Sequence, residues 1–291
     1  MSGACGEPEA RPALGILAGG GPLPGRVAAA AAAVGRPVFI IGLEGFADPA
    51  MLALWPHKVF RVGAAGQILR ALRAAKCRDL VLIGTVRRPS FFDLRPDVEA
   101  ARMLARAGRA ALSGDDGMLA AVIKVLGEEG FRVVGVQEIL NEAVAPAGVL
   151  GAASPDAQAM ADIERGVAVA RALGAVDVGQ GCVVQQGLVL AVEAIEGTDA
   201  MLARCAALLR PGPGGVLVKL VKPGQDRRAD LPTVGPETVR GAVAAGLRGI
   251  AFEAGATLLA DRALAIDVAD RAGVFLLGLD PSSLTGEGHT T

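Results

Sequence analysis

Short apolar runs alternate with longer amphipathic segments along the first half of the chain. The runs at residues 14–18, 37–43, 79–86 and 132–139 predict strands, and the segments at residues 23–34, 65–76, 96–112 and 115–127 predict helices. The third run, DLVLIGTV, is apolar on both faces, as parallel strands are. This strand–helix alternation predicts a Rossmann-like parallel sheet in an N-terminal domain that spans residues 1–140.

A linker and a second α/β domain are predicted for the rest of the chain. Residues 141–154 hold the small residues, glycine and proline that are typical of a linker. Residues 155–291 then alternate helical segments (155–173, 198–209, 236–245 and 261–272) with strands in 181–194, 216–221, 249–253 and 274–279. At 291 residues the chain is longer than one core usually spans, so two domains are the default expectation.

Charge is concentrated in one short segment of an otherwise apolar chain. Only 20% of all residues are charged, yet residues 219–230 contain Lys219, Lys222, Asp226, Arg227, Arg228 and Asp230. Pro223-Gly224 breaks the preceding strand, so the charges fall on a loop at a strand end, where chemistry is often placed. Cations beside carboxylates suit an anionic, phosphorylated substrate with a metal ion or a water-activating base. A solvated charged loop explains the same spacing equally well.

A second polar cluster accompanies the apolar run at residues 188–194. Glu193 lies inside that run, and Glu196, Thr198 and Asp199 lie in the turn after it. Thr198 or Asp199 could cap the helix that follows. Glu193 has no such explanation. Because an unpaired buried carboxylate is costly, we expect it to have a cationic partner or a metal, or to be neutral.

The turn Gly19–Gly25 joins the first predicted strand to a helix. Its amides and the helix N-terminus could hold a phosphate, although the glycine spacing departs from GxGxxG and a tight turn is the simpler alternative. Glu44 follows the second strand, about where a dinucleotide-binding fold places its ribose-binding acid.

Other polar residues at strand ends and turns are candidate substrate contacts. Thr85 and Arg87 end the third strand, although a basic turn exposed to solvent is the alternative. Asp116 could bind a metal or ribose hydroxyls, or cap the helix that follows it. Gln185 and Gln186 lie in a predicted hairpin turn, where they could also be ordinary turn residues.

Two further features concern the end of the charged loop and a second carboxylate in a strand. Thr233 and Gly235 close the loop, and backbone amides there could reach a phosphate. Glu253 lies in an apolar strand, as Glu193 does. We expect one of the two to be structural, and prefer Glu193 for function.

Three segments carry a family resemblance: LGILAGGGPLPGRVA, GQGCVVQQGLVLAVEAIEGTDAML and GGVLVKLVKPGQDRRADLPTVGPET. Through them the chain resembles the UDP-2,3-diacylglucosamine pyrophosphatases of the LpxI type. The resemblance implies an enzyme of lipid A synthesis that splits UDP-2,3-diacylglucosamine, with magnesium, into UMP and 2,3-diacylglucosamine 1-phosphate (lipid X). It also implies two domains that hold the lipid between them, and it favours a nucleotide or phosphate role for Gly20 and Gly21.

These observations lead to an assignment of roles. Asp226 is the leading candidate for metal ligand or water-positioning base, and Lys219, Lys222 and Arg228 are candidates for oxyanion stabilisation. A hard cation, Mg²⁺ or alternatively Mn²⁺, is expected to use Asp226, Glu196 and Asp199. The predicted substrate-binding set is Gly20, Gly21, Thr85, Arg87, Asp116, Gln185, Gln186, Glu193, Glu196, Thr198, Asp199, Thr233 and Gly235.

Several absences narrow the function classes. The chain has no tyrosine and only two histidines, His57 and His289, and it lacks GxSxG, GxxxxGK[ST] and any Cys/His cluster for zinc. The net charge of −1 gives no general basic surface for nucleic acid. A nucleotide-dependent oxidoreductase, supported by the glycine turn and Glu44, is the alternative function, and a non-catalytic nucleotide-sugar or lipid-binding protein is a third.

The same patterns bear on location and assembly. Four scattered cysteines without a CxxC pair predict reduced thiols, and the first residues lack the pattern of a signal peptide. No apolar run is long enough to span a bilayer. We therefore expect a cytoplasmic protein that contacts the inner membrane surface peripherally to reach a glycolipid nucleotide substrate. A homodimer is a further expectation.

Overall fold

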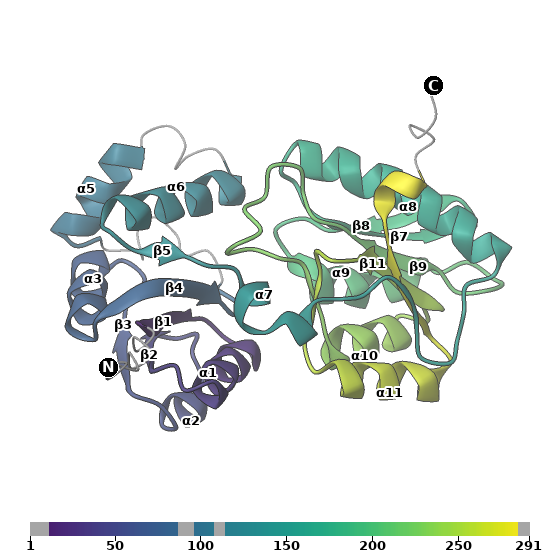
Figure 1. Ribbon diagram of the computed structural model, residues 1–291. Helices are drawn as coiled ribbons and strands as arrows, with labels where there is room; N and C mark the ends of the chain where they lie inside the picture. The colour runs from purple at the N-terminus through teal and green to yellow at the C-terminus, as the bar shows by residue number, and fades with distance from the viewer. Residues whose placement is uncertain (1–11, 87–95, 108–113, 285–291) are drawn as a thin grey trace, which may run out of the picture. The chain divides into compact units, whose positions relative to one another are not determined.

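The computed structural model describes residues 12–86, 96–107 and 114–284 (Figure 1). The chain forms two compact units, the first made of Met1–Asn141 with Arg228–Asp230 and the second of Glu142–Arg227 with Leu231–Thr291. Each unit combines strands with helices, so the predicted α/β class is confirmed. Within the described ranges, no helix has both the length and the apolar composition that crossing a bilayer requires.

The first unit contains a five-stranded sheet in the order β3-β2-β1-β4-β5. Every pairing in it is parallel, as predicted. The order is that of the first five strands in the doubly wound sheets that bind dinucleotides. The strands are β1 (Ala13–Ala18), β2 (Val38–Leu43), β3 (His57–Phe60), β4 (Cys77–Ile83) and β5 (Arg132–Val133).

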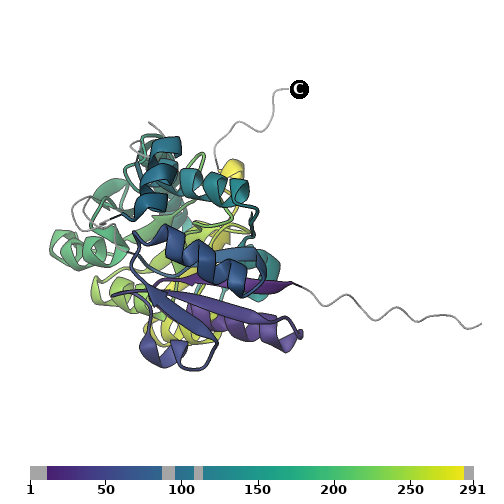
Figure 2. The ribbon, with the colours of Figure 1, turned by 90° about the vertical axis from the view of Figure 1, so that its left-hand side faces the viewer.

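Helices cover both faces of this sheet, with α1 on one side and α3 on the other (Figure 2). On the α3 side, Leu69 and Leu72 pack with Ile41 and Leu80 of the strands in one buried cluster. Burial of such side chains is the main stabilising contribution to this layer. The helices are α1 (Leu23–Ala33), α2 (Pro49–Leu52), α3 (Ala65–Ala74), α5 (Val98–Ala107), α6 (Gly114–Glu128) and α7 (Val136–Ile139).

Two elements of the first unit differ from the sequence prediction. The edge strand β3 was not predicted, because three of its four residues are exposed and the segment HKVF has no apolar run. Residues 132–139, predicted as one strand, form only the short strand β5 and then the helix α7. The change occurs at Gly135, whose amide donates to Glu138 Oε1 at 2.9 Å and so starts a helical turn.

The second unit contains a six-stranded mixed sheet in the order β6-β13-β11-β9-β7-β8. The three central strands β13, β11 and β9 are parallel, and β6, β7 and β8 run antiparallel to their neighbours. The strands are β6 (Gly148–Leu150), β7 (Gly181–Gln185), β8 (Leu188–Val192), β9 (Val216–Lys219), β11 (Gly249–Glu253) and β13 (Phe275–Leu279). A separate two-stranded ribbon pairs β10 (Thr233–Val234) with β12 (Leu258–Leu259).

Two buried layers enclose the second sheet. The helix α8 covers one face, where Ile163 and Val167 pack with Val184 and Val218. The helices α10 and α11 lie on the other face (Figure 1), and their core includes Met201 of α9. The helices are α8 (Ala157–Ala175), α9 (Gly197–Cys205), α10 (Pro236–Ala244) and α11 (Arg262–Ala272), with short 3₁₀ turns η2 (Asn141–Ala143), η3 (Ala206–Leu208) and η4 (Pro281–Ser283).

The stretch expected to be a linker, residues 141–154, is structured in part. Its residues Gly148–Leu150 form the strand β6, which pairs antiparallel with β13. Leu150 is buried in the core of the second unit. The strand has only three residues and lies among small residues, glycine and proline, so no periodic pattern indicates it in the sequence.

A buried carboxylate ties together the amino-terminal edge of the first sheet. Asp79, near the start of β4, accepts hydrogen bonds from Arg36 at 2.5 Å and from Arg132 at 2.7 and 2.9 Å. The hydrogen bonds from Arg132, and then those from Arg36, hold the pKa of Asp79 below its usual range, although burial acts in the opposite direction. Because this edge is opposite the carboxyl ends of the strands, we interpret Asp79 as structural.

The substitution Asp79→Asn is expected to destabilise the first unit by about 2 kcal/mol at neutral pH, since it weakens charge-assisted hydrogen bonds at a buried site. The folded-state pKa is lowered, so the stabilisation is complete above the unfolded-state value of about 3.9 and is lost as the pH falls through the folded-state value. Urea unfolding of both proteins between pH 7 and pH 3 measures this difference. Asp267→Asn, at the exposed ion pair with Arg271, is the matched control, with an expected change below about 1 kcal/mol.

Candidate active site

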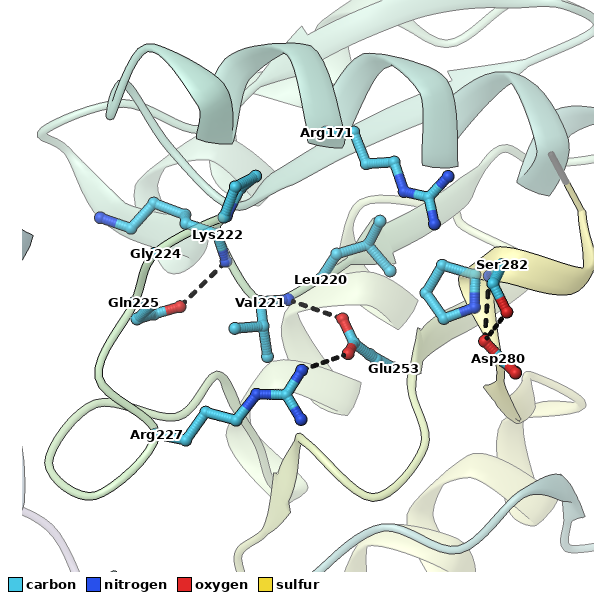
Figure 3. A pocket seen from close by; sticks show the side chains of 12 residues that line it. Arg171, Leu220, Val221, Lys222, Gly224, Gln225, Arg227, Glu253, Asp280 and Ser282 are labelled. Atoms are coloured by element: carbon cyan, nitrogen blue, oxygen red, sulfur yellow. Dashed lines mark hydrogen bonds and ion pairs between the residues drawn. The ribbon is translucent and has the colours of Figure 1, made fainter. Parts of the chain in front are cut away.

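The carboxyl ends of β9, β11 and β13 lie at one edge of the second sheet, the edge where ligands bind in open α/β sheets. Lys219 ends β9 and Glu253 ends β11. A pocket of about 320 Å³ opens beside these strand ends (Figure 3). Its polar side chains come from Arg171, Lys222, Gln225, Arg227, Glu253, Asp280 and Ser282.

Glu253 shapes the charged loop that lines this pocket. Its Oε2 accepts a hydrogen bond from the Val221 amide at 3.2 Å, and its Oε1 accepts one from Arg227 at 3.1 Å (Figure 3). Gln225 Oε1 accepts from the amide of Lys222 at 3.0 Å and closes the turn in between. Glu253 therefore holds both ends of residues 221–227, in keeping with the structural role expected for it.

Lys222, predicted to stabilise an oxyanion, has an acidic partner from outside the loop. Its Nζ lies 2.6 Å from Asp177 Oδ1, and only 10% of its side chain is exposed. Asp177 follows α8 and was not identified in the sequence, because a single aspartate after a helix carries no distinctive pattern. Arg171, which extends from α8 to the pocket, was missed for the same reason (Figure 3).

Lys219, Thr198 and Glu193 form a hydrogen-bonded chain at the same sheet edge. Lys219 is 6% exposed, and its Nζ donates to Thr198 Oγ1 at 2.7 Å and to the Thr233 carbonyl oxygen at 3.4 Å. The Thr198 hydroxyl donates to Glu193 Oε1 at 2.7 Å. Four residues predicted separately as catalytic or substrate-binding are thus brought together. Glu193 is thus linked to the Lys219 ammonium through the Thr198 hydroxyl.

The other acidic residues of the second cluster lie at the start of α9. Glu196 forms an ion pair with Arg204 at 2.8 Å, and this hydrogen bond holds the pKa of Glu196 below its usual value. Asp199 is exposed in the first turn of the helix. Gly235 directly precedes α10, and its amide donates to Thr238 Oγ1 at 3.4 Å.

Gln185 and Gln186 lie away from the charged loop. Gly181 pairs with Lys219, whereas Gln185 is at the other end of β7, so it is separated from that pairing by four residues, or roughly 13 Å. The buried Gln185 side chain donates to the carbonyl oxygens of Arg210 and Pro213 and accepts from the Arg210 amide. Gln186 donates to Pro211. Both side chains hold the chain at residues 210–213 instead of facing the loop.

In the first unit, the glycine turn lies at the point where the strand order reverses. β2 pairs on one side of β1 and β4 on the other, so the carboxyl ends of β1 and β4 flank the site where nucleotides bind in such sheets. Gly20 and Thr85 exchange backbone hydrogen bonds of 2.9 Å. A side chain at Gly19 would lie 2.7 Å from the Thr85 carbonyl oxygen, which explains the glycine there. Gly21 is exposed, with φ of +87°.

Four further predicted residues are Arg87, Asp116, Asp226 and Arg228. Arg87 lies outside the described residues, and so does the side chain of Asp116, whose backbone belongs to α6. Asp226 is partly buried within the charged loop, and Arg228 is exposed. Arg228 belongs to the segment that clusters with the first unit.

Comparison with known proteins supports the resemblance noted in the sequence. The model of the LpxI N-terminal domain matches residues 13–143, and that of the LpxI C-terminal domain matches residues 146–277. The chain belongs to the LpxI family. The UDP-2,3-diacylglucosamine pyrophosphatase LpxI of Caulobacter vibrioides is 45% identical to it over 274 residues, which cover 92% of this chain and 98% of that protein.

The residues of this LpxI family member fit a magnesium ion only in one mode. In the described part of the chain, no three His, Cys, Asp or Glu side chains are grouped closely enough to hold a metal ion. Glu196, a predicted ligand, already binds Arg204. Mg²⁺ commonly uses one or two carboxylates together with substrate phosphates. The described donor set therefore suits only a magnesium ion that substrate phosphates also coordinate.

The position of Gln185, away from the charged loop, predicts the effect of its substitution. Gln185→Leu is expected to cost about 2–4 kcal/mol of stability, because it leaves backbone groups of Arg210 and Pro213 without their buried partner. Turnover should stay close to wild type. Chemical denaturation and steady-state kinetics measure the two effects. Gln186→Asn is the matched control, since asparagine tolerates the positive φ of +53° and the bond that it loses is exposed. A large loss of kcat in a stably folded Gln185→Leu protein would show that Gln185 does act in substrate binding or turnover.

Proposed function

We propose that this protein hydrolyses the diphosphate of UDP-2,3-diacylglucosamine to UMP and 2,3-diacylglucosamine 1-phosphate in lipid A synthesis. The proposal is supported by membership of the LpxI family across both units and by the activity named for the Caulobacter vibrioides relative. The structural observation that carries it is the buried Lys219 ammonium at the carboxyl edge of the second sheet. Fixed cations at such an edge suit a substrate whose reacting group is a diphosphate.

In this proposal the first unit binds the nucleotide phosphate, and the second unit supplies the reacting groups. The glycine turn and the start of α1 in the first unit bind nucleotide phosphate through backbone amides. In the second unit, Lys219 stabilises charge on the phosphoryl oxygens, and Asp226 contacts the metal or orients the water. Lys222 is a weaker candidate for direct contact, because Asp177 already holds its ammonium group.

The proposed location follows from the same substrate. A nucleotide carrying two acyl chains resides in a membrane, so we propose peripheral contact of a cytoplasmic protein with the inner membrane surface. We also propose a homodimer, which light scattering of the purified protein measures.

Turnover is expected to require a hard divalent cation, which would supply charge neutralisation at the diphosphate. Dialysis against EDTA should abolish hydrolysis, and Mg²⁺ or Mn²⁺ should restore it. Zn²⁺ is the comparison ion, since the chain offers no histidine or cysteine cluster for it. Full activity in chelator would remove the metal from the proposal.

Asp226→Ala is expected to lower kcat by about 10²-fold or more with little change in KM, because a residue that acts mainly in the transition state contributes little to ground-state binding. Asp226→Asn separates chemistry from loop shape, since it keeps the size and loses the charge. Asp230→Asn, in the same loop, is the matched control and should retain most of the rate. Wild-type turnover in Asp226→Asn would exclude Asp226 from the chemistry.

A further inference from the structure

Three neighbouring strands of the second sheet direct three residues to one face. Side chains two positions apart on a strand lie on the same side. Leu217, Val183 and Ala191 belong to the core beneath α9, α10 and α11. Two positions further toward the functional edge on each strand come Lys219, Gly181 and Glu193. This periodicity places the ammonium and the carboxylate on the α9 face, with a glycine between them.

The strand pairing fixes this arrangement. Gly181 pairs with Lys219, and the Glu193 amide donates to the Gly181 carbonyl oxygen at 2.8 Å. A side chain at Gly181 would lie 2.8 Å from Glu193 Oε2, so the glycine leaves the space that the carboxylate occupies. The first turn of α9 places Thr198 above this glycine-lined gap, within hydrogen-bond distance of both charges.

The donor and acceptor chemistry of Lys219, Thr198 and Glu193 fixes which group donates in each of the two hydrogen bonds. An ammonium group only donates, so Thr198 Oγ1 must accept from Lys219 and use its own proton to reach Glu193. Each hydrogen bond has one charged partner, and such bonds are stronger than neutral ones. If the hydroxyl pointed elsewhere, the Glu193 carboxylate would lose its hydrogen bond from Thr198, whereas Lys219 would keep the Thr233 carbonyl oxygen.

In the described structure, the contacts of the Glu193 side chain indicate a single role, the interaction with Thr198. Glu193 is 6% exposed, and its side-chain hydrogen bond in the described structure goes to Thr198. Its second oxygen, Oε2, is buried without a hydrogen-bond partner among the described residues. A buried carboxylate is costly to keep without a compensating partner. Here it lies close to Lys219, which is the buried lysine at this edge of the described sheet and the one that the proposed reaction uses.

We propose that Thr198 and Glu193 are positioning residues, which hold the Lys219 ammonium in place for the reaction and do not themselves contact the substrate. The inference rests on the proposed function. A lysine has a long flexible stem, and displacement of a catalytic group by about 1 Å can cost 10²-fold in rate. The hydroxyl and the carboxylate remove that freedom before the substrate arrives.

A double-mutant cycle tests this dependence. Thr198→Val is nearly isosteric and is expected to lower kcat about 10- to 100-fold with little change in KM, whereas Thr198→Ser should retain most of the rate because it keeps the hydroxyl. Lys219→Met should lower kcat at least as much. If Thr198 acts through Lys219, adding Thr198→Val to Lys219→Met changes kcat no further. Equal losses from Thr198→Val in both backgrounds would overturn the proposal.

The chain offers a matched control in the same unit. Thr257 is fully buried, and its hydroxyl has no hydrogen-bond partner in the described structure. Thr257→Val therefore makes the same chemical change where no hydrogen bond is lost, and it should leave both kcat and stability close to wild type. A loss of rate equal to that of Thr198→Val would show that buried threonine-to-valine changes act on this unit without involving Lys219.

A second route avoids changing any of the three residues. Gly181→Ala is expected to push the Glu193 carboxylate aside, because the added methyl group would meet the end of that flexible side chain. The fall in kcat should resemble that of Glu193→Gln and should vanish in the Lys219→Met background. This variant keeps the test open if Thr198→Val folds poorly, and unchanged kcat in folded Gly181→Ala and Glu193→Gln would overturn the proposal.

A readout that does not depend on turnover separates this inference from the proposed function. Acetylation of lysines by an N-hydroxysuccinimide ester, followed by mass spectrometry, should modify Lys219 slowly in the wild type and several-fold faster in Thr198→Val. Labelling of Lys222 should stay the same in both. If wild-type protein does not hydrolyse UDP-2,3-diacylglucosamine, the proposed function fails and labelling alone decides the positioning role. Equal labelling of Lys219 in wild type and Thr198→Val would refute it.

Discussion

The cost of burying the Lys219 ammonium is the constraint on which the functional edge of the second sheet depends. An ammonium group that loses its water needs acceptors and an opposite charge nearby. Thr198, Glu193 and the Thr233 carbonyl oxygen supply them, and each comes from a different segment of the chain. The end of β8, the start of α9 and the strand β10 are therefore held around one cation. A structural change in any of these three segments would therefore alter the environment of the Lys219 ammonium.

The two edges of each sheet have different tasks. At the amino edge of the first sheet, Asp79 joins Arg36 and Arg132, and near the amino end of β9 the Gln185 amide anchors residues 210–213. Both side chains use all or most of their hydrogen-bonding capacity on the protein itself. At the carboxyl edges lie the glycine turn, the charged loop and the Lys219 ammonium that the proposed reaction uses. The scaffold is satisfied internally at one edge and retains polar groups for a ligand at the other.

The long periodic elements were predictable from sequence, because a helix or a buried strand repeats its pattern over many residues. The short strands β3 and β6 were not, since three or four residues without an apolar run carry no period. Lys219, Glu193 and Thr198 were identified one by one, but their contact depends on strand register. Gln185 was predicted to contact the substrate but lies far from the charged loop, and the β7–β8 hairpin explains why. The turn of this hairpin lies at the opposite edge of the sheet from Glu193, and strand direction cannot be read from residue types alone.

The charges of the loop serve first to give it a shape. Lys222 binds Asp177 and Arg227 binds Glu253, and both carboxylates come from elements outside the loop. The mixture of signs that marked this segment in the sequence is thus matched by a second set of charges on the scaffold. A loop ordered in this way loses its conformational freedom on folding, so less must be lost when a substrate binds. Dipoles and charges fixed in advance are also the ones that stabilise a transition state without reorganisation.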